Sequence, residues 1–375
     1  MMKRRNAIVL GNGIVGLTCA RVLLLGGWHV TIVKSPISIV RTIALQEQTK
    51  RILDEIWACN IASICNSRVL TGRRIRWAAG ETVSTNEISG LCIQVTNMAQ
   101  ALQNRLAESE MVEFCETIPS CREPNISVFD ALEGSGKNSS FVSFGERVMH
   151  VWQCIKVKQK VGSRLEIFSG NGYWLIALPN PEEDGSTRSM SVQLALPSSE
   201  INPHEILTRV INETGLTSLQ RRLFEPIIEP CFEKRSDMVS IAPSIHSETT
   251  LGLPFLLGSR AMKYDPICGD GTGQGIKSAI LAIAASNSET KLGSNTVRTH
   301  MRNRMTGTFC AHLRNCISYY QTIESSIAWQ SDIEKMQHGL ASLYSNLKHG
   351  DMPSLSLKAP VEMKEWAEGP SLIKA

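Results

Sequence analysis

Residues 257–276 read LGSRAMKYDPICGDGTGQGI, and an apolar run follows them. The pair Asp265 and Pro266 introduces a glycine-rich turn, and the apolar run predicts a helix after it. Gly269 and Gly271 allow the backbone to approach a ligand closely. The stretch therefore predicts a turn and a helix whose positive N-terminal end stabilises a negatively charged group.

A second glycine-rich turn, GNGIVG, occupies residues 11–16. The run at 7–10 before it is continuously apolar, which predicts a buried parallel strand. Gly11, Gly13 and Gly16 have the GxGxxG spacing of a dinucleotide-binding turn. Such glycines permit a tight turn, close approach to a pyrophosphate and close packing of helix on strand.

The residues after this turn complete a nucleotide-binding unit. They predict a helix from Ile14 to about Leu25, whose N-terminus faces the phosphates, and a strand at 29–33. Lys34 stands where a Glu or Asp normally binds the adenosine ribose, and a lysine cannot accept those hydrogen bonds. Three interpretations stay open: contact with an NADP 2′-phosphate, a ribose held by backbone or water, or a surface lysine.

Two such helix starts far apart in one chain are typical of proteins that wrap a whole FAD. The chain resembles the class A flavoprotein monooxygenases and their relatives, the flavin-dependent tryptophan halogenases and geranylgeranyl reductases. The resemblance covers most of the chain, and its specific part is the two glycine-rich turns. It implies an α/β fold: a Rossmann-like FAD-binding domain, an interleaved antiparallel-sheet substrate domain and a helical C-terminal segment.

The resemblance also implies cofactor contacts. In the family a Gly-Asp pair contacts the flavin ribityl chain, and here Gly258 and Ser259 stand at that place. Arg41 stands where relatives place an arginine that touches the flavin, with a solvated arginine as the alternative. The full set of implied cofactor-binding residues is Gly11, Gly13, Ile14, Gly16, Lys34, Arg41, Gly258, Ser259, Pro266, Gly269 and Gly271.

The acidic anchors of the family are altered in this chain. Residues 130–139, DALEGSGKNS, resemble a mid-chain Asp-Gly motif, but Ser135 replaces the aspartate tied to NAD(P)H handling. Lys34 and Ser259 replace the other two acidic residues. We therefore expect weaker FAD binding or a divergent subgroup. The absence of the aspartate at 135 makes direct nicotinamide use doubtful, so we also expect a separate flavin reductase or other electron donor.

The middle of the chain changes to strand-like alternation, which predicts an antiparallel sheet over the substrate cavity. Trp152, Tyr173 and Trp174 either line that cavity or pack in the sheet. The predicted domains are FAD-binding at 1–70, 95–145 and 237–285, a sheet roof at 71–94 and 147–235, C-terminal helices at 290–350 and an extended tail at 351–375.

The composition excludes several classes of function. The formal net charge of +4 over 375 residues is too small to indicate nucleic-acid binding. No apolar run reaches the roughly 20 residues of a membrane helix, so we expect a cytoplasmic protein without a membrane partner. The 11 cysteines lack CxxC and CxxH spacing, which predicts buried thiols in a reducing compartment and neither a metal site nor a redox pair.

The resemblance implies an FAD-dependent monooxygenase that transfers oxygen to an electron-rich aromatic ring. Asp265 begins the glycine-rich turn at 265–271, which faces the flavin in the resembled family. Halogenase relatives carry a carboxylate before the same proline. Asp265 is therefore our candidate catalytic residue, as a base on an indole or phenol or in proton delivery. The alternative is that Asp265 only caps the turn.

The Asp-Pro-x-x-Gly-Asp-Gly turn is similar to that of flavoproteins that hydroxylate a tryptophan of a partner protein during tryptophylquinone biogenesis. The expected substrate is thus an aromatic small molecule or a peptidyl tryptophan. A halogenase is disfavoured, because YWLIALP at 173–179 only partly matches that group's Trp-x-Trp-x-Ile-Pro run and no catalytic lysine is evident. A reductase, or a weakly catalytic flavoprotein that binds and matures a partner, stays an alternative.

Overall fold

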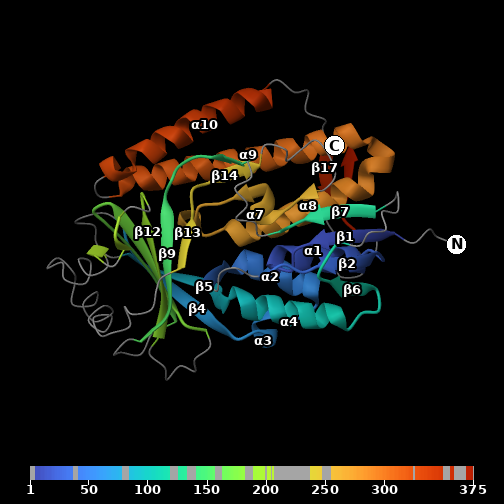
Figure 1. Cartoon of the computed structure of the whole chain (residues 1–375), viewed down its shortest axis with the longest axis horizontal. Helices are drawn as coiled ribbons and strands as arrows, with labels where there is room; N and C mark the ends of the chain where they lie inside the picture. The colour runs from blue at the N-terminus through green and yellow to red at the C-terminus, as the bar shows by residue number, and fades with distance from the viewer. Residues whose placement is uncertain are drawn as a thin grey trace.

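The computed structural model describes most of the chain, in the following ranges: 5–36, 41–77, 84–118, 126–132, 141–156, 163–181, 189–198, 201–203, 205–206, 237–246, 255–323, 326–348, 355–358 and 369–374. Figure 1 shows a large sheet at one end of the molecule and two long helices, α9 and α10, along one side.

A parallel sheet of five strands, in the order β15-β7-β1-β2-β6, forms the nucleotide-binding unit. Each residue of β1 pairs in register with β2 on one side and β7 on the other. Ala7 and Val9 are buried, in agreement with the continuous apolar pattern. The strands are β1 Asn6–Leu10, β2 His29–Val33, β6 Val112–Cys115, β7 Ile126–Asp130 and β15 Phe255–Leu256.

Helices pack against this sheet and against one another. The predicted helix after the first turn is confirmed, because α1 runs from Ile14 to Leu25. The long helix α8 contacts α1, and α9 contacts α8. The other helices of this part are α2 Glu47–Trp57, α3 Ile61–Ile64, α4 Val95–Ala107, α7 Gly258–Ala261, the 3₁₀ turn η2 Pro266–Cys268 and α8 Gly271–Leu292.

The second sheet has eight strands in the order β13-β9-β12-β11-β10-β4-β5-β3. All its pairings are antiparallel except that of β10 with β4. The strands are β3 Thr42–Gln46, β4 Ser67–Arg76, β5 Ser84–Gln94, β9 Val148–Lys156, β10 Arg164–Gly170, β11 Tyr173–Pro179, β12 Ser189–Leu196 and β13 Asp237–Ser240.

The eight-stranded sheet extends beyond the ranges expected from the sequence. β3 and β13 belong to it, although residues 42–46 and 237–240 were expected in the FAD-binding domain. The reason is strand pairing: β3 pairs with β5 and β13 pairs with β9. The sheet therefore leads directly into α2, because β3 ends at Gln46 and α2 begins at Glu47. A small third sheet links β8 Phe141–Ser143, β14 Ser244–His246 and β16 Met262–Lys263.

The C-terminal part consists of helices and a hairpin. The helical elements are α9 Ser294–Thr322, the 3₁₀ turn η3 Ser326–Trp329 and α10 Gln330–Lys348. The tail, expected to be extended, contains the antiparallel strands β17 Leu355–Lys358 and β18 Ser371–Lys374. Leu372 is buried, and its amide donates a 2.8 Å hydrogen bond to Ser288 Oγ of α8. Among the described helices none has the length and apolarity needed to cross a bilayer.

Candidate functional site

The two glycine-rich turns, far apart in the sequence, lie against each other. Val15, in the first turn of α1, packs onto Gly258 and Gly275. A Cβ added to Gly275 would lie 2.7 Å from Val15 Cγ2, and one added to Gly258 would lie 3.3 Å from Val15 Cγ1. The N-terminal ends of α1 and α8 therefore meet at one place.

The first turn has the backbone that its glycines predict. Gly11 has φ +99, and a Cβ there would lie 2.8 Å from the carbonyl oxygen of Ala131. A Cβ at Gly16 would collide with the carbonyl oxygen of Gly11. Gly13 is the N-cap of α1, and no side chain of the described residues caps this end. Its N–H groups are thus available to an anion.

The second turn is held from two sides. Gly269 has φ +68, and its carbonyl oxygen accepts a 3.2 Å hydrogen bond from Gln46 Nε2 at the end of β3. A Cβ on Gly273 would collide with Thr49 of α2. α8 begins at Gly271, and its N-cap residue makes no side-chain cap. This helix end is open to a ligand in the same way as that of α1.

These features fit FAD. A pyrophosphate and a flavin ring that carries negative charge when reduced each suit an uncapped helix N-terminus. The close glycine contacts leave no room for side chains where the two turns pack on neighbouring parts of the chain.

The sequence also predicted cofactor contacts for Lys34, Arg41 and Ser259. Lys34 Nζ lies 3.4 Å from Glu116 Oε1 and 5.9 Å from the ring centre of Phe114, which ties the lysine to β6. Arg41 is exposed immediately before β3, and its carbonyl oxygen accepts from the amide of Val95. Ser259 is exposed on α7. Ser135 lies outside the described residues.

Asp130, at the end of β7, makes a contact that sequence reasoning missed. Its Oδ2 lies 3.0 Å from Arg260 Nε, and its Oδ1 accepts from the amide of Leu132. This ion pair ties the parallel sheet to α7 beside Gly258. An aspartate that closes an apolar strand is the only signal in the sequence.

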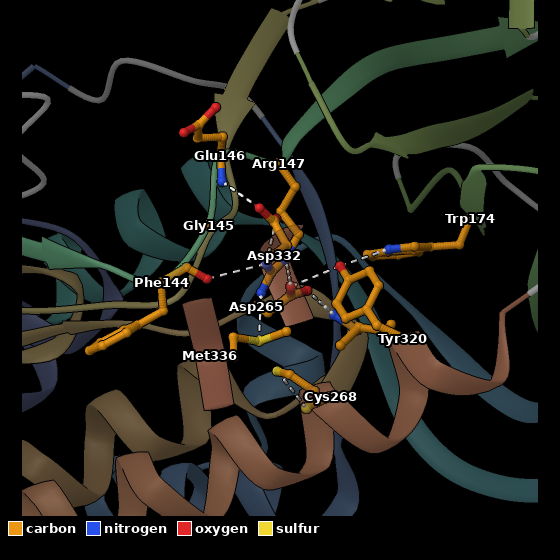
Figure 2. A network of polar contacts seen from close by, with 12 residues as sticks. Phe144, Gly145, Glu146, Arg147, Trp174, Asp265, Cys268, Tyr320, Asp332 and Met336 are labelled. Carbon is orange, nitrogen blue, oxygen red and sulfur yellow. Dashed lines mark hydrogen bonds and ion pairs between the residues drawn. The ribbon is translucent and has the colours of Figure 1, made fainter. Parts of the chain in front are cut away.

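Asp265 lies at the centre of a buried polar network (Figure 2). Its side chain is 0% exposed. Oδ1 accepts a 2.9 Å hydrogen bond from the amide of Ile267, which caps the turn η2. Oδ2 accepts from Arg147 Nε at 2.6 Å and from the hydroxyl of Tyr320 at 2.9 Å. Asp265 therefore caps the turn, but it does not only cap it, because the same carboxylate binds Arg147 and Tyr320. Its catalytic role stays a prediction.

Arg147 joins this turn to the C-terminal helices. Its Nη1 donates to Asp332 Oδ2 at 2.7 Å, and its guanidinium carbon lies 4.6 Å from the ring centre of Tyr320. Burial acts to lower the pKa of Arg147, but Tyr320, Asp265 and Asp332 outweigh it and raise the pKa. The arginine therefore stays charged between two carboxylates.

Aromatic side chains extend the network into the eight-stranded sheet. Trp174 Nε1 of β11 donates a 3.0 Å hydrogen bond to the hydroxyl of Tyr320. Burial, and then Asp265, raise the pKa of Tyr320, so this hydroxyl keeps its proton. Trp152 and Tyr173 belong to a separate hydrophobic cluster, because alternate residues of a strand face opposite sides. Of the three predicted aromatic residues, Trp174 alone contacts the Asp265 network in the described structure.

Beside the network lies a cluster of two cysteines and one histidine. Cys268 Sγ, on the second turn, is 3.7 Å from Cys316 Sγ on α9. His312 Nε2 is 3.3 Å from Cys316 Sγ and accepts a 2.9 Å hydrogen bond from the amide of Asp265. Sequence spacing missed this cluster because Cys268 comes from a distant element. His312 and Cys316, one helical turn apart, are its only local signal.

Sequence comparison finds no protein-family model that matches the chain, and no curated protein matches it. The structure is similar to solved ones. The peptidyl tryptophan dihydroxylase QhpG, essential for tryptophylquinone cofactor biogenesis, has a TM-score of 0.69 at 15% identity over 89% of this chain and 79% of that chain.

Two further solved structures are similar over most of the chain. The flavin-dependent halogenase CmlS has a TM-score of 0.67 at 17% identity over 93% of this chain and 72% of that chain. HpxO from Klebsiella pneumoniae, solved with FAD and uric acid, has a TM-score of 0.64 at 12% identity over 92% and 97%. The chain thus shares the α/β fold of these three structures, as the resemblance in the sequence implied.

Proposed function

We propose that this protein is an FAD-dependent monooxygenase that hydroxylates an electron-rich aromatic ring. The observation that carries the proposal is the meeting of two uncapped helix ends, where Val15 of α1 packs on Gly258 and on Gly275 of α8. One extended cofactor, with a redox ring at one end and a pyrophosphate in its middle, fits both helix ends. The shared fold supports the same conclusion.

When bound, FAD supplies two-electron chemistry and the activation of O₂. The amide groups at the start of α1 bind the pyrophosphate, as in other dinucleotide folds. The start of α8 stabilises negative charge on the ring. Lys34 pairs with the exposed Glu116 across 3.4 Å, and its contact with the adenosine ribose or a 2′-phosphate stays a prediction.

Asp265 acts as a positioning residue in this proposal. Its side chain is completely buried, and both of its oxygens are already occupied by Ile267, Arg147 and Tyr320. The carboxylate therefore fixes the flavin-facing turn relative to α9 and the large sheet. Such fixation matters because small displacements of a reacting group slow catalysis strongly.

The finer proposal is that the aromatic ring is a tryptophan side chain of a partner protein. Similarity of the fold to a peptidyl tryptophan dihydroxylase supports it. Ser135, in place of the aspartate that the resembled family ties to NAD(P)H handling, supports a separate reductase or electron donor in place of direct nicotinamide use. An aromatic small molecule is the alternative substrate.

The first experiment is a visible absorption spectrum of the purified protein, followed by titration with FAD. We expect a yellow protein or saturable binding. Reduced holoenzyme is then exposed to ¹⁸O₂ with candidate aromatic compounds or tryptophan-containing partner proteins. Intact-mass analysis should show added ¹⁸O. A protein that stays colourless with FAD contradicts the proposal and favours a non-catalytic maturation factor.

A further inference from the structure

We propose that Cys268 and Cys316 form a peroxide-sensitive dithiol pair, whose oxidation to a disulfide displaces the flavin-facing turn and weakens FAD binding. The formation of the disulfide does not depend on the proposed oxygenase activity. The effect on affinity rests on the proposed FAD site.

The two sulfur atoms are already in contact across two elements. Cys268 Sγ of η2 lies 3.7 Å from Cys316 Sγ of α9. A disulfide bond has a length of about 2.05 Å, so side-chain rotation and a small backbone shift suffice to form it. Cys316 is fully buried, whereas Cys268 is partly exposed on the turn. This asymmetry gives one accessible thiol and one internal thiol.

The hydrogen bonds direct the Cys316 proton toward Cys268. The amide of Asp265 can only donate, so its 2.9 Å bond to His312 Nε2 occupies the single lone pair of that nitrogen. The Cys316 thiol is then left to donate to Cys268 Sγ. This hydrogen bond, and then His312, lower the pKa of Cys268, while burial raises that of Cys316. Cys268 is the nucleophile and Cys316 the resolving thiol.

The reaction balances with hydrogen peroxide as the oxidant. The Cys268 thiolate attacks one peroxide oxygen, the O–O bond breaks, and a sulfenic acid and water form after uptake of one proton. Cys316 then attacks the Cys268 sulfur, the S–O bond breaks, and a second water leaves. Two thiols are oxidised to one disulfide, and peroxide is reduced to two waters. An external dithiol reverses the change by exchange.

A metal ion is a weaker interpretation of the same cluster. Cys268, His312 and Cys316 each offer a ligand atom, and these atoms lie within 4.8 Å of one another. Coordination through His312 Nε2 would require the lone pair that now accepts from the amide of Asp265. That buried amide would lose its partner, which costs free energy. The sulfur–sulfur contact requires no such loss.

Disulfide formation affects FAD through the turn itself. Closing the sulfur separation from 3.7 Å to about 2.05 Å draws η2 toward α9. On its other side the turn is held by the bond from Gln46 Nε2 to the Gly269 carbonyl oxygen. Movement toward α9 strains this bond and shifts the start of α8. A displaced turn that makes about one hydrogen bond fewer to FAD binds the cofactor about fivefold more weakly.

The test oxidises the full-length protein with hydrogen peroxide, blocks remaining thiols with N-ethylmaleimide and maps the peptides by mass spectrometry. We expect a peptide pair linked through Cys268 and Cys316 that dithiothreitol releases. Cys115, partly exposed and bonded to the Ile32 carbonyl oxygen, is the internal control and should stay alkylatable at the same peroxide dose. Dimedone should trap a sulfenic acid at Cys268 in Cys316→Ala.

Titration of FAD into reduced and oxidised wild-type protein then measures the coupling. We expect about fivefold weaker binding after oxidation, restored by dithiothreitol. The proposal is overturned if Cys268 and Cys316 stay alkylatable when Cys115 is oxidised, or if purified protein holds a metal that their alkylation releases. Equal FAD affinities of the two forms overturn the coupling. If neither form binds FAD, the proposed FAD site fails while the mapping still decides the dithiol.

Discussion

Arg147 and Asp265 are 118 positions apart in the sequence, and their side chains meet at 2.6 Å with no exposure to solvent. Arg147 follows the strand β8 and its loop, and Asp265 is the N-cap of the turn η2. With Asp332 of α10 on the other side of the guanidinium, the pair connects three parts of the fold. The turn on which the proposed function depends is therefore positioned by charge as well as by packing.

Replacing Arg147 by methionine should destabilise the protein by about 3–5 kcal/mol, because two buried carboxylates lose their partner. Chemical denaturation of the purified variants measures this change. The matched control is Lys335→Met, since Lys335 forms its ion pair with the exposed Glu146 next to Arg147. That variant should change stability little. Equal losses in the two variants would contradict the assignment.

Asp265→Asn should separate positioning from stability. The amide keeps an acceptor for the Ile267 amide but loses the charge that faces Arg147. We expect the variant to lose about 1–3 kcal/mol of stability. We also expect kcat to fall by up to about a hundredfold, with KM nearly unchanged. Asp332→Asn, on the other side of the same arginine, should lose similar stability but keep most turnover. Equal loss of kcat in both variants would rule out a special role for Asp265.

Gly275→Ala should push α8 away from α1, because the new Cβ would lie 2.7 Å from Val15 Cγ2. We expect weaker FAD binding and a loss of about 1–3 kcal/mol in stability. Val15→Ala in the same chain removes the obstructing methyl groups and should restore part of both. Gly307→Ala, on α9 with nothing within 4 Å of the new Cβ, should gain up to about 1 kcal/mol. Absence of rescue by Val15→Ala would disprove the contact.

Cys268 should react with iodoacetamide at lower pH than other partly exposed thiols. The bond from Cys316, and then His312, lower its pKa, against opposing effects of burial and Asp265. A lower pKa gives more thiolate at a given pH, so alkylation begins at more acidic pH. Burial and then Glu113 raise the pKa of Cys115, which should react only at more alkaline pH. Residue-resolved mass spectrometry measures the alkylation of Cys268 and of Cys115 as a function of pH. Bound FAD should slow the alkylation of Cys268.

Much of the fold follows from the sequence. The apolar run 7–10, the helix from Ile14 to Leu25 and the strand at 29–33 are local patterns of hydrophobicity and glycine, and β1, α1 and β2 confirm them. The strand-like alternation between 148 and 196 likewise agrees with β9 to β12. These patterns can be recognised in the sequence because burial of one face of a helix or strand makes apolar residues recur at a fixed spacing.

The strands that join the eight-stranded sheet could not all be predicted from the sequence. β3 and β13 join it through backbone pairing with β5 and β9, and such pairing leaves no residue-type signature. The proposed contacts of Arg41 and Ser259 stay predictions, and both side chains are exposed. The cap made by Asp265 could be predicted because its bond reaches only two residues along the chain, whereas its pairing with Arg147 could not.

The sequence by itself determined the two glycine-rich turns, since their glycines act through local backbone geometry and steric room. Only the tertiary structure decided that Val15 packs on Gly275, that Arg147 pairs with Asp265 and that Cys268 meets Cys316. These contacts join elements far apart in the chain. Their distances depend on how whole helices and sheets pack, and no local pattern of residues encodes that packing.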